Sequence, residues 1–138
     1  MTPAKAPLPF LGTWKLTSCE SSHPDMPHPA SGTTTFTEEK GSIRYRSKTV
    51  WSDGRKTSVQ AILKLDGSWC PITGSLIADS ISVESIPNGL VAKLRKADVD
   101  TGTTRSTVSS DGRTTNGVWE MVGPGGIAMT WKTTSARA

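Results

Sequence analysis

The sequence of 138 residues, 14.7 kDa, suits a single domain and leaves little room for a separate cofactor-binding domain. Hydrophobic residues make up 34% of it and charged residues 20%. It has no run of roughly eighteen apolar residues, so we predict no membrane span. The net charge of +4 is spread along the chain without a block of like charges, which argues against a nucleic-acid-binding stripe.

The N-terminal stretch, residues 1–9, is predicted to be an extension that precedes the folded domain. Its Pro-containing sequence lacks the continuous apolar segment of a signal peptide, so we expect a cytoplasmic protein by default. The domain itself is predicted over residues 10–134, and residues 135–138 are predicted to be a C-terminal tail.

Period-two alternation of apolar and polar residues dominates the rest of the chain and predicts an all-β protein. In the first predicted strand, Trp14, Leu16 and Ser18 share one face. Asp-Gly and Asn-Gly pairs between later strands supply the positive φ of tight hairpins. The predicted strands cover residues 11–20, 33–38, 43–51, 57–65, 80–86, 90–95, 103–110, 114–122 and 127–132.

A Pro-rich segment, residues 21–31, separates the first two predicted strands. Pro24, Pro27 and Pro29 remove backbone donors and fix φ, so the segment is predicted to be an ordered loop or flap rather than a helix.

Strands joined by short turns form a meander, and a meander of this length must hide its two edges. We therefore predict a single up-and-down antiparallel β-barrel of about 8–10 strands. Barrels of this size commonly hold one small ligand. Many of the inward-facing side chains are small, which leaves room for a ligand.

The inward faces of the predicted strands supply candidate ligand-binding residues that would line the pocket. They are Phe36, Tyr45, Ser47, Trp51, Val59, Leu63, Leu94, Trp119, Met121, Met129 and Trp131. Aromatic and aliphatic side chains dominate this set, so we expect a small, mainly apolar molecule to bind there non-covalently.

The segment Phe10-Leu11-Gly12-Thr13-Trp14-Lys15-Leu16 resembles the first-strand signature of the lipocalin and fatty-acid-binding-protein superfamily, the calycins. The resemblance implies that the Trp14 indole plugs the closed end of a lipocalin-like barrel. It also implies that a basic residue of the last strand covers the indole, for which Lys132 is the nearest match. Residues 49–74 are similar to small bacterial lipocalin-like domains of unassigned function.

Two departures from that family bear on the ligand. The Pro-rich loop cannot form the helix-turn-helix lid of fatty-acid-binding proteins, and the C-terminal Met129-Thr130-Trp131-Lys132 lacks their carboxylate-clamping Arg-x-Tyr. These departures argue against a fatty acid.

Metal and cofactor chemistry finds little support in the sequence. Cys19, His23 and His28 fit no standard zinc spacing, and a haem ligand would need an inward histidine on a late strand. We expect no metal and no cofactor. Cys19 and Cys70 are expected to be free, partly buried thiols.

Two alternatives to a simple container remain. One is an enzyme with the same barrel, an isomerase or hydrolase that uses Tyr45 or Glu120 in the pocket. The strand alternation, however, favours a solvated Glu120. The other is a surface interaction module that uses Arg44, Arg46 and Lys48. We expect a binding protein rather than an enzyme, as a monomer or homodimer.

Overall fold

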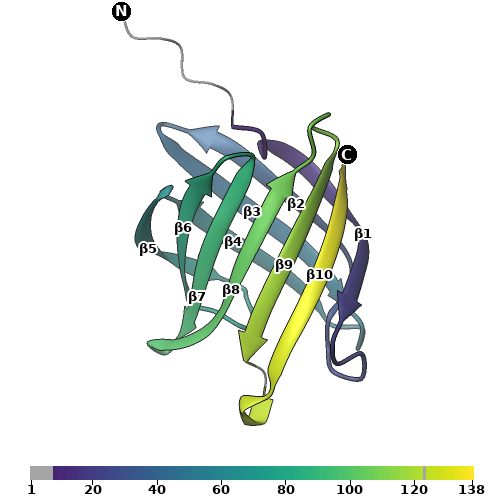
Figure 1. The fold of residues 1–138 in the computed structure, drawn as a ribbon. Coiled ribbons are helices and arrows are strands. Elements are labelled where there is room, and N and C mark those ends of the chain that lie inside the picture. The colour runs from purple at the N-terminus through teal and green to yellow at the C-terminus, as the bar shows by residue number, and fades with distance from the viewer. Residues whose placement is uncertain (1–7, 123) are drawn as a thin grey trace, which may run out of the picture.

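The computed structural model describes residues 8–122 and 124–138, and these form one closed barrel of ten antiparallel strands. Each strand pairs with its neighbours in sequence, and the last pairs with the first (Figure 1). The strands are β1 (Gly12–Ser21), β2 (Pro29–Glu39), β3 (Ser42–Trp51), β4 (Lys56–Leu63), β5 (Asp66–Thr73), β6 (Ser80–Ile86), β7 (Gly89–Lys96), β8 (Val99–Val108), β9 (Thr114–Val122) and β10 (Ala128–Arg137). The prediction of an all-β, up-and-down barrel is confirmed.

Connections between strands are short, and a 3₁₀ turn at Pro124–Gly126 precedes β10. Within residues 8–122 and 124–138, no helix has the length and apolar character needed to cross a membrane.

The hairpin turns follow the chemistry of their Asp-Gly pairs. In the β3–β4 turn, Gly54 has φ 89°, and the Asp53 carboxylate accepts a hydrogen bond from the backbone N–H of Arg55 at 3.1 Å. The β8–β9 turn repeats this arrangement with Asp111 and the N–H of Arg113 at 3.0 Å. Glycine tolerates the left-handed backbone, and the aspartate closes the turn.

Strand β1 contains an irregularity that the alternation pattern does not predict. The pairing register with β10 shifts between Leu16 and Ser18, as in a β-bulge, so the next residues change face. Trp14 is 3% exposed, as the pattern predicts. Ser18 is exposed, whereas Cys19 is half-buried and packs against the core, so the expectation for Ser18 was wrong.

Strand β10 is longer than the sequence suggests. It continues to Arg137, and Ser135, Ala136 and Arg137 pair with Leu16, Lys15 and Trp14 of β1. The expectation of a tail from residue 135 was therefore wrong, because these residues close the barrel. At the other end of the chain, residues 1–7 of the predicted extension lie outside the described residues, and Leu8 packs against the core.

The core consists of two clusters of buried side chains. The larger includes Phe10 and Trp14 near the end where β1 begins, and it continues along β4 to β7 as far as Ala78 and Leu94 near the opposite end. The smaller lies toward the opposite end, where the β1–β2, β3–β4, β5–β6 and β9–β10 connections gather (Figure 1), and consists of Trp51, Met121, Met129 and Trp131.

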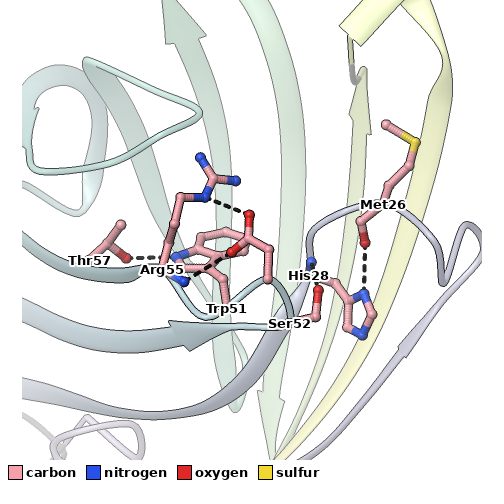
Figure 2. A network of polar contacts seen from close by, with 7 residues as sticks. Met26, His28, Trp51, Ser52, Arg55 and Thr57 are labelled. Atoms are coloured by element: carbon pink, nitrogen blue, oxygen red, sulfur yellow. Dashed lines mark hydrogen bonds and ion pairs between the residues drawn. The ribbon is translucent and has the colours of Figure 1, made fainter.

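The Pro-rich connection between β1 and β2 is held against its neighbours. The backbone N–H of Ser52 donates to the carbonyl of His28 at 2.8 Å. The N–H of His28 donates to the Ser52 hydroxyl at 3.1 Å, as Figure 2 shows. The ring of His28 lies 2.9 Å from the carbonyl of Met26. Met26 packs on the smaller cluster, so this loop covers that end of the barrel.

Candidate functional site: a cavity inside the barrel

A cavity of about 220 Å³ lies inside the barrel. All ten strands contribute to its wall, together with Phe10 before β1 and Ser75, Leu76 and Ile77 in the β5–β6 connection. Side chains from both core clusters line it, so it lies between them.

Most of the predicted lining residues lie in this wall. They are Phe36, Tyr45, Ser47, Trp51, Val59, Leu63, Leu94, Trp119 and Trp131. Met121 and Met129 lie outside it. Both are buried, and each lies two residues from a lining indole on the same strand face: Met121 follows Trp119 on β9, and Met129 precedes Trp131 on β10.

One side of the cavity is aliphatic. It is formed by β4 to β7, where branched and straight aliphatic side chains face inward in nearly every lining position. They are Val59, Leu63, Ile72, Ile81, Val83, Leu90, Ala92 and Leu94. The exception is Thr57 at the start of β4, whose hydroxyl accepts the indole N–H of Trp51 at 2.9 Å.

The other side of the cavity carries hydroxyl groups. On β2 and β3 they belong to Thr34, Tyr45, Ser47 and Thr49, and on β8 to β10 to Thr104, Ser106, Thr115, Thr133 and Ser135. No Asp, Glu, Lys, Arg or His is among the described residues of the wall. The cavity therefore offers apolar surface and hydrogen bonds but no charge.

Tyr45 is the one lining residue among those described that ionises in water. Burial raises the pKa of its phenol, and a side-chain hydrogen bond with Ser47 opposes that rise. Ser47 is also 3.1 Å from the Thr34 hydroxyl. The phenol is therefore a neutral hydrogen-bonding group near pH 7.

Three indoles form a layer at the end of the cavity that lies nearer the β1–β2 and β3–β4 connections. The Trp51 ring, from β3, meets the Trp131 ring, from β10, edge to face at 5.6 Å between centroids. Trp119 lies 6.0 Å from Trp131 on the neighbouring strand. Ile77 packs against both core clusters beside this layer, and Leu76, which also lines the cavity, is 37% exposed.

Gly117 opens a notch in the hydroxyl-bearing wall. A Cβ at this position would lie 2.6 Å from the Thr133 hydroxyl, 3.2 Å from the Ser106 hydroxyl and 3.5 Å from Nε1 of Trp119. Thus two hydroxyls and an indole nitrogen gather where the strand has no side chain.

The opposite end of the cavity is sealed by Trp14. Its indole N–H donates to the carbonyl of Phe10 at 2.8 Å. The guanidinium of Arg137 lies over the ring at 4.2 Å. The same group donates to the carbonyls of Pro9 at 3.1 Å, Leu11 at 2.7 Å and Gly112 at 2.9 Å, so it ties β10 to both neighbouring segments.

The basic residue that covers Trp14 is therefore Arg137, and the expectation for Lys132 was wrong. Lys132 is exposed and pairs with Glu20, near the other end of β1. The bulge in β1 and the length of β10 set this register, and neither is visible in the sequence motif.

The candidate catalytic residues do not converge in the cavity. Glu120 is exposed on the outer face of β9, as the alternation predicts, so the described part of the wall has Tyr45 but no carboxylate. Among the described residues, no three His, Cys, Asp or Glu side chains are grouped closely enough to hold a metal ion. Cys19 is half-buried, and burial raises the pKa of its thiol.

The basic residues on β3 form a short row on the outside of the barrel. Arg44 pairs with Glu39 at 2.6 Å, which neutralises one end of the row, and Arg46 and Lys48 are exposed.

The cavity wall has more residues than were predicted, and two groups of the missing ones show why. Thr104, Ser106 and Thr115 lie at inward positions of the predicted strands, but serine and threonine give no distinct signal of burial. Thr133 and Ser135 lie beyond the predicted end of the last strand at residue 132, because β10 continues to Arg137. Ser75, Leu76 and Ile77 lie in a connection, where alternation gives no facing. An apolar pair in a loop was the one signal that could have revealed them.

No family model matches the sequence, and no curated protein sequence is similar to it. Solved structures with the same fold do exist. Zebrafish ileal bile acid-binding protein in complex with cholic acid matches with a TM-score of 0.57 and 11% identity, over 94% of this chain and 99% of that one. The S-type phycobiliprotein lyase CPES from Guillardia theta matches with a TM-score of 0.56 and 11% identity, over 94% and 89%. Together with the ten-stranded closed barrel and the Trp14 seal, these matches show that the chain has a calycin-like fold, that of the lipocalin and fatty-acid-binding-protein superfamily.

Proposed function

We propose that this protein binds a small, mainly apolar molecule non-covalently in the barrel cavity. The observation that carries the proposal is a cavity of about 220 Å³ with one aliphatic side and no charged residue among those described in its wall. Ligand pockets are concave and mostly apolar, with a few polar groups that orient the guest.

The size of the cavity limits the ligand. A cavity of about 150 Å³ in another protein accommodates benzene. At about 220 Å³, this one suits a molecule of one or two rings or a comparable branched chain. A four-ring steroid or an open-chain tetrapyrrole would require the wall to move.

The comparisons support binding in general rather than a particular ligand. By their titles, one matched structure holds cholic acid, and the other is a phycobiliprotein lyase. At 11% identity these likenesses concern the fold alone, so the ligand class proposed here depends on the chemistry of the wall.

Calorimetric titration with naphthalene tests the proposal. We expect saturable binding at one site per chain. Ala92 faces the cavity from β7 and is 8% exposed, so Ala92→Phe should fill the space and weaken binding at least about tenfold.

A matched control is Ile62→Phe. Ile62 lies on β4 and is 46% exposed, so the same aromatic ring added there leaves the cavity unchanged. Naphthalene should bind this variant as it binds the wild type. An absence of saturable binding to the wild type, or equal binding to both variants, would contradict the proposal.

A further inference from the structure

The lack of charged side chains among the described lining residues restricts which ligands the cavity can bind. The described lining residues include no cation that could pair with a carboxylate and no anion that could pair with an amine. Burial of an unpaired charge is strongly unfavourable. The wall therefore selects against ionised ligands.

One buried donor in the wall has no acceptor. Trp131 is 2% exposed, and its Nε1 has no hydrogen-bond partner among the residues that the structure describes. The two other buried indoles differ, because Trp14 donates to the carbonyl of Phe10 and Trp51 donates to the hydroxyl of Thr57. Buried polar groups in proteins are nearly always paired, so an unpaired one calls for an explanation.

The residue that carries the unpaired donor is part of a polar corner of the cavity wall, which we define as Thr104, Ser106, Gly117, Trp119, Trp131 and Thr133. Within it, Thr104 pairs with Trp119, and Trp119 pairs with Trp131, so the three lie at one level on neighbouring strands. The Thr104 hydroxyl is also buried without a partner in the described part of the chain. The Gly117 notch lies one step away on the same face of β9.

We infer that the ligand is uncharged and carries a hydrogen-bond acceptor, such as a ketone, ester or amide carbonyl, that accepts the Nε1–H of Trp131. Its acceptor occupies the polar corner, and its apolar part lies against the aliphatic side formed by β4 to β7. This inference rests on the proposed function and adds to it the chemical class of the ligand.

Two probes of nearly identical shape test the acceptor. Acetophenone has a carbonyl oxygen where α-methylstyrene has a methylene group. The measured quantity is the ratio of their association constants, because the ratio within one protein cancels their different solubilities in water. In Trp131→Phe the donor is lost while an aromatic ring remains, so we expect the ratio of acetophenone to α-methylstyrene to fall about tenfold relative to wild type.

Trp51→Phe is the matched control. It removes the same volume from the same layer, but the Trp51 N–H already donates to Thr57, so the ratio should not fall. The inference is overturned if Trp131→Phe leaves the ratio unchanged, or if both variants lower it equally. If neither probe binds the wild type, the proposed function fails and this inference with it. If both probes bind the wild type but Trp131→Phe leaves the ratio of their association constants unchanged, this inference is contradicted and the proposed function is not.

A measurement on the wild type does not depend on the folding of a variant. With assigned indole N–H resonances, acetophenone should move the Trp131 proton downfield and α-methylstyrene should not. A Trp131 resonance that responds equally to both bound probes would overturn the inference.

Benzoate provides the test of charge. At about pH 7 its carboxylate is ionised and would lack a cationic partner in the wall. We expect it to bind at least a hundredfold more weakly than acetophenone. Equal affinity would overturn the requirement for an uncharged ligand.

Discussion

Gly12 explains why the first-strand motif begins with glycine. Its φ is +114°, and a Cβ at this position would lie 2.6 Å from Nη1 of Arg137. Glycine therefore gives the guanidinium room to reach the carbonyl of Leu11 and the face of Trp14. The motif predicted that Trp14 seals this end of the barrel, where its indole is 3% exposed. The residue that covers it lies 123 positions later than Trp14 and could be identified only from the register of β10.

At the residue scale, the protonation of Tyr45 gives a prediction. Because burial raises the pKa of Tyr45 above the usual value of about 10 for a tyrosine, the unfolded chain loses this proton at a lower pH than the folded protein does. The folded state then binds more protons, so the free energy of unfolding should fall as the pH rises above about 10. Tyr45→Phe should reduce this fall.

Urea unfolding at about pH 8 and pH 11 checks this expectation, with wild type and Tyr45→Phe compared at each pH. Tyr45 is the only tyrosine, so the ultraviolet absorbance of tyrosinate reports its ionisation directly. Ionisation of the folded protein at the pH of a free tyrosine would contradict the prediction.

At the scale of elements, the β4–β5 contact is the weakest seam of the barrel. Gln60 with Thr73 and Ala61 with Ile72 are the two residue pairs that join these strands, whereas β4 pairs with β3 from Ile43 to Val50. At one end of the seam the strands come close together, since a Cβ on Gly74 would lie 1.9 Å from the carbonyl oxygen of Ser58. Elsewhere the ladder is incomplete.

Native-state hydrogen exchange should detect this seam. Amides of β4 that point toward β3 should exchange slowly, and those that point toward β5, outside the paired residues, should exchange fast. Both sets belong to one strand, so each serves as the control for the other. Uniform protection along β4 would contradict the prediction.

The strands were more predictable than the side-chain contacts. The sequence predicted β6 and β9 with their observed bounds, because hairpin turns of Asn-Gly and Asp-Gly flank clear alternation. No strand was predicted over β5, where Pro71 interrupts a stretch without regular alternation. The bulge of β1 was also missed, because a register shift depends on the partner strand.

The alternation pattern predicted only part of the cavity wall for the same reason, because it describes each strand without its partners. Period-two facing placed Tyr45, Ser47 and Trp51 in the wall because the alternation of β3 is unbroken. It could not place Met129 relative to Trp131, since both face inward and only their depth along the axis separates them. Depth depends on how the strands tilt and stagger around the barrel, which is a property of the whole sheet.

At the scale of the whole molecule, the barrel closes through the last residues of β10. Deletion of residues 135–138 removes the pairing of Ser135, Ala136 and Arg137 with β1, and with it the cover of Trp14. We expect the deletion to lower the free energy of unfolding well beyond the loss of about 2 kcal/mol expected for Arg137→Ala alone.

Urea denaturation of the deletion variant and of Arg137→Ala measures this difference. Arg137→Lys retains the charge but not the planar set of donors, so it should resemble Arg137→Ala. If the deletion costs no more than Arg137→Ala, the pairing of Ser135 and Ala136 does not hold the barrel closed.

The described lining residues of the cavity carry no charge, whereas the protein as a whole has a net charge of +4. Dissolved ions screen interactions between exposed charges but have little to screen in a neutral interior. The affinity of a guest inside the barrel should therefore vary little between dilute buffer and molar sodium chloride, whereas adsorption of anions to Arg46 and Lys48 on the outside should disappear. Ionic strength alone can thus distinguish a molecule held within this protein from one attracted to its surface.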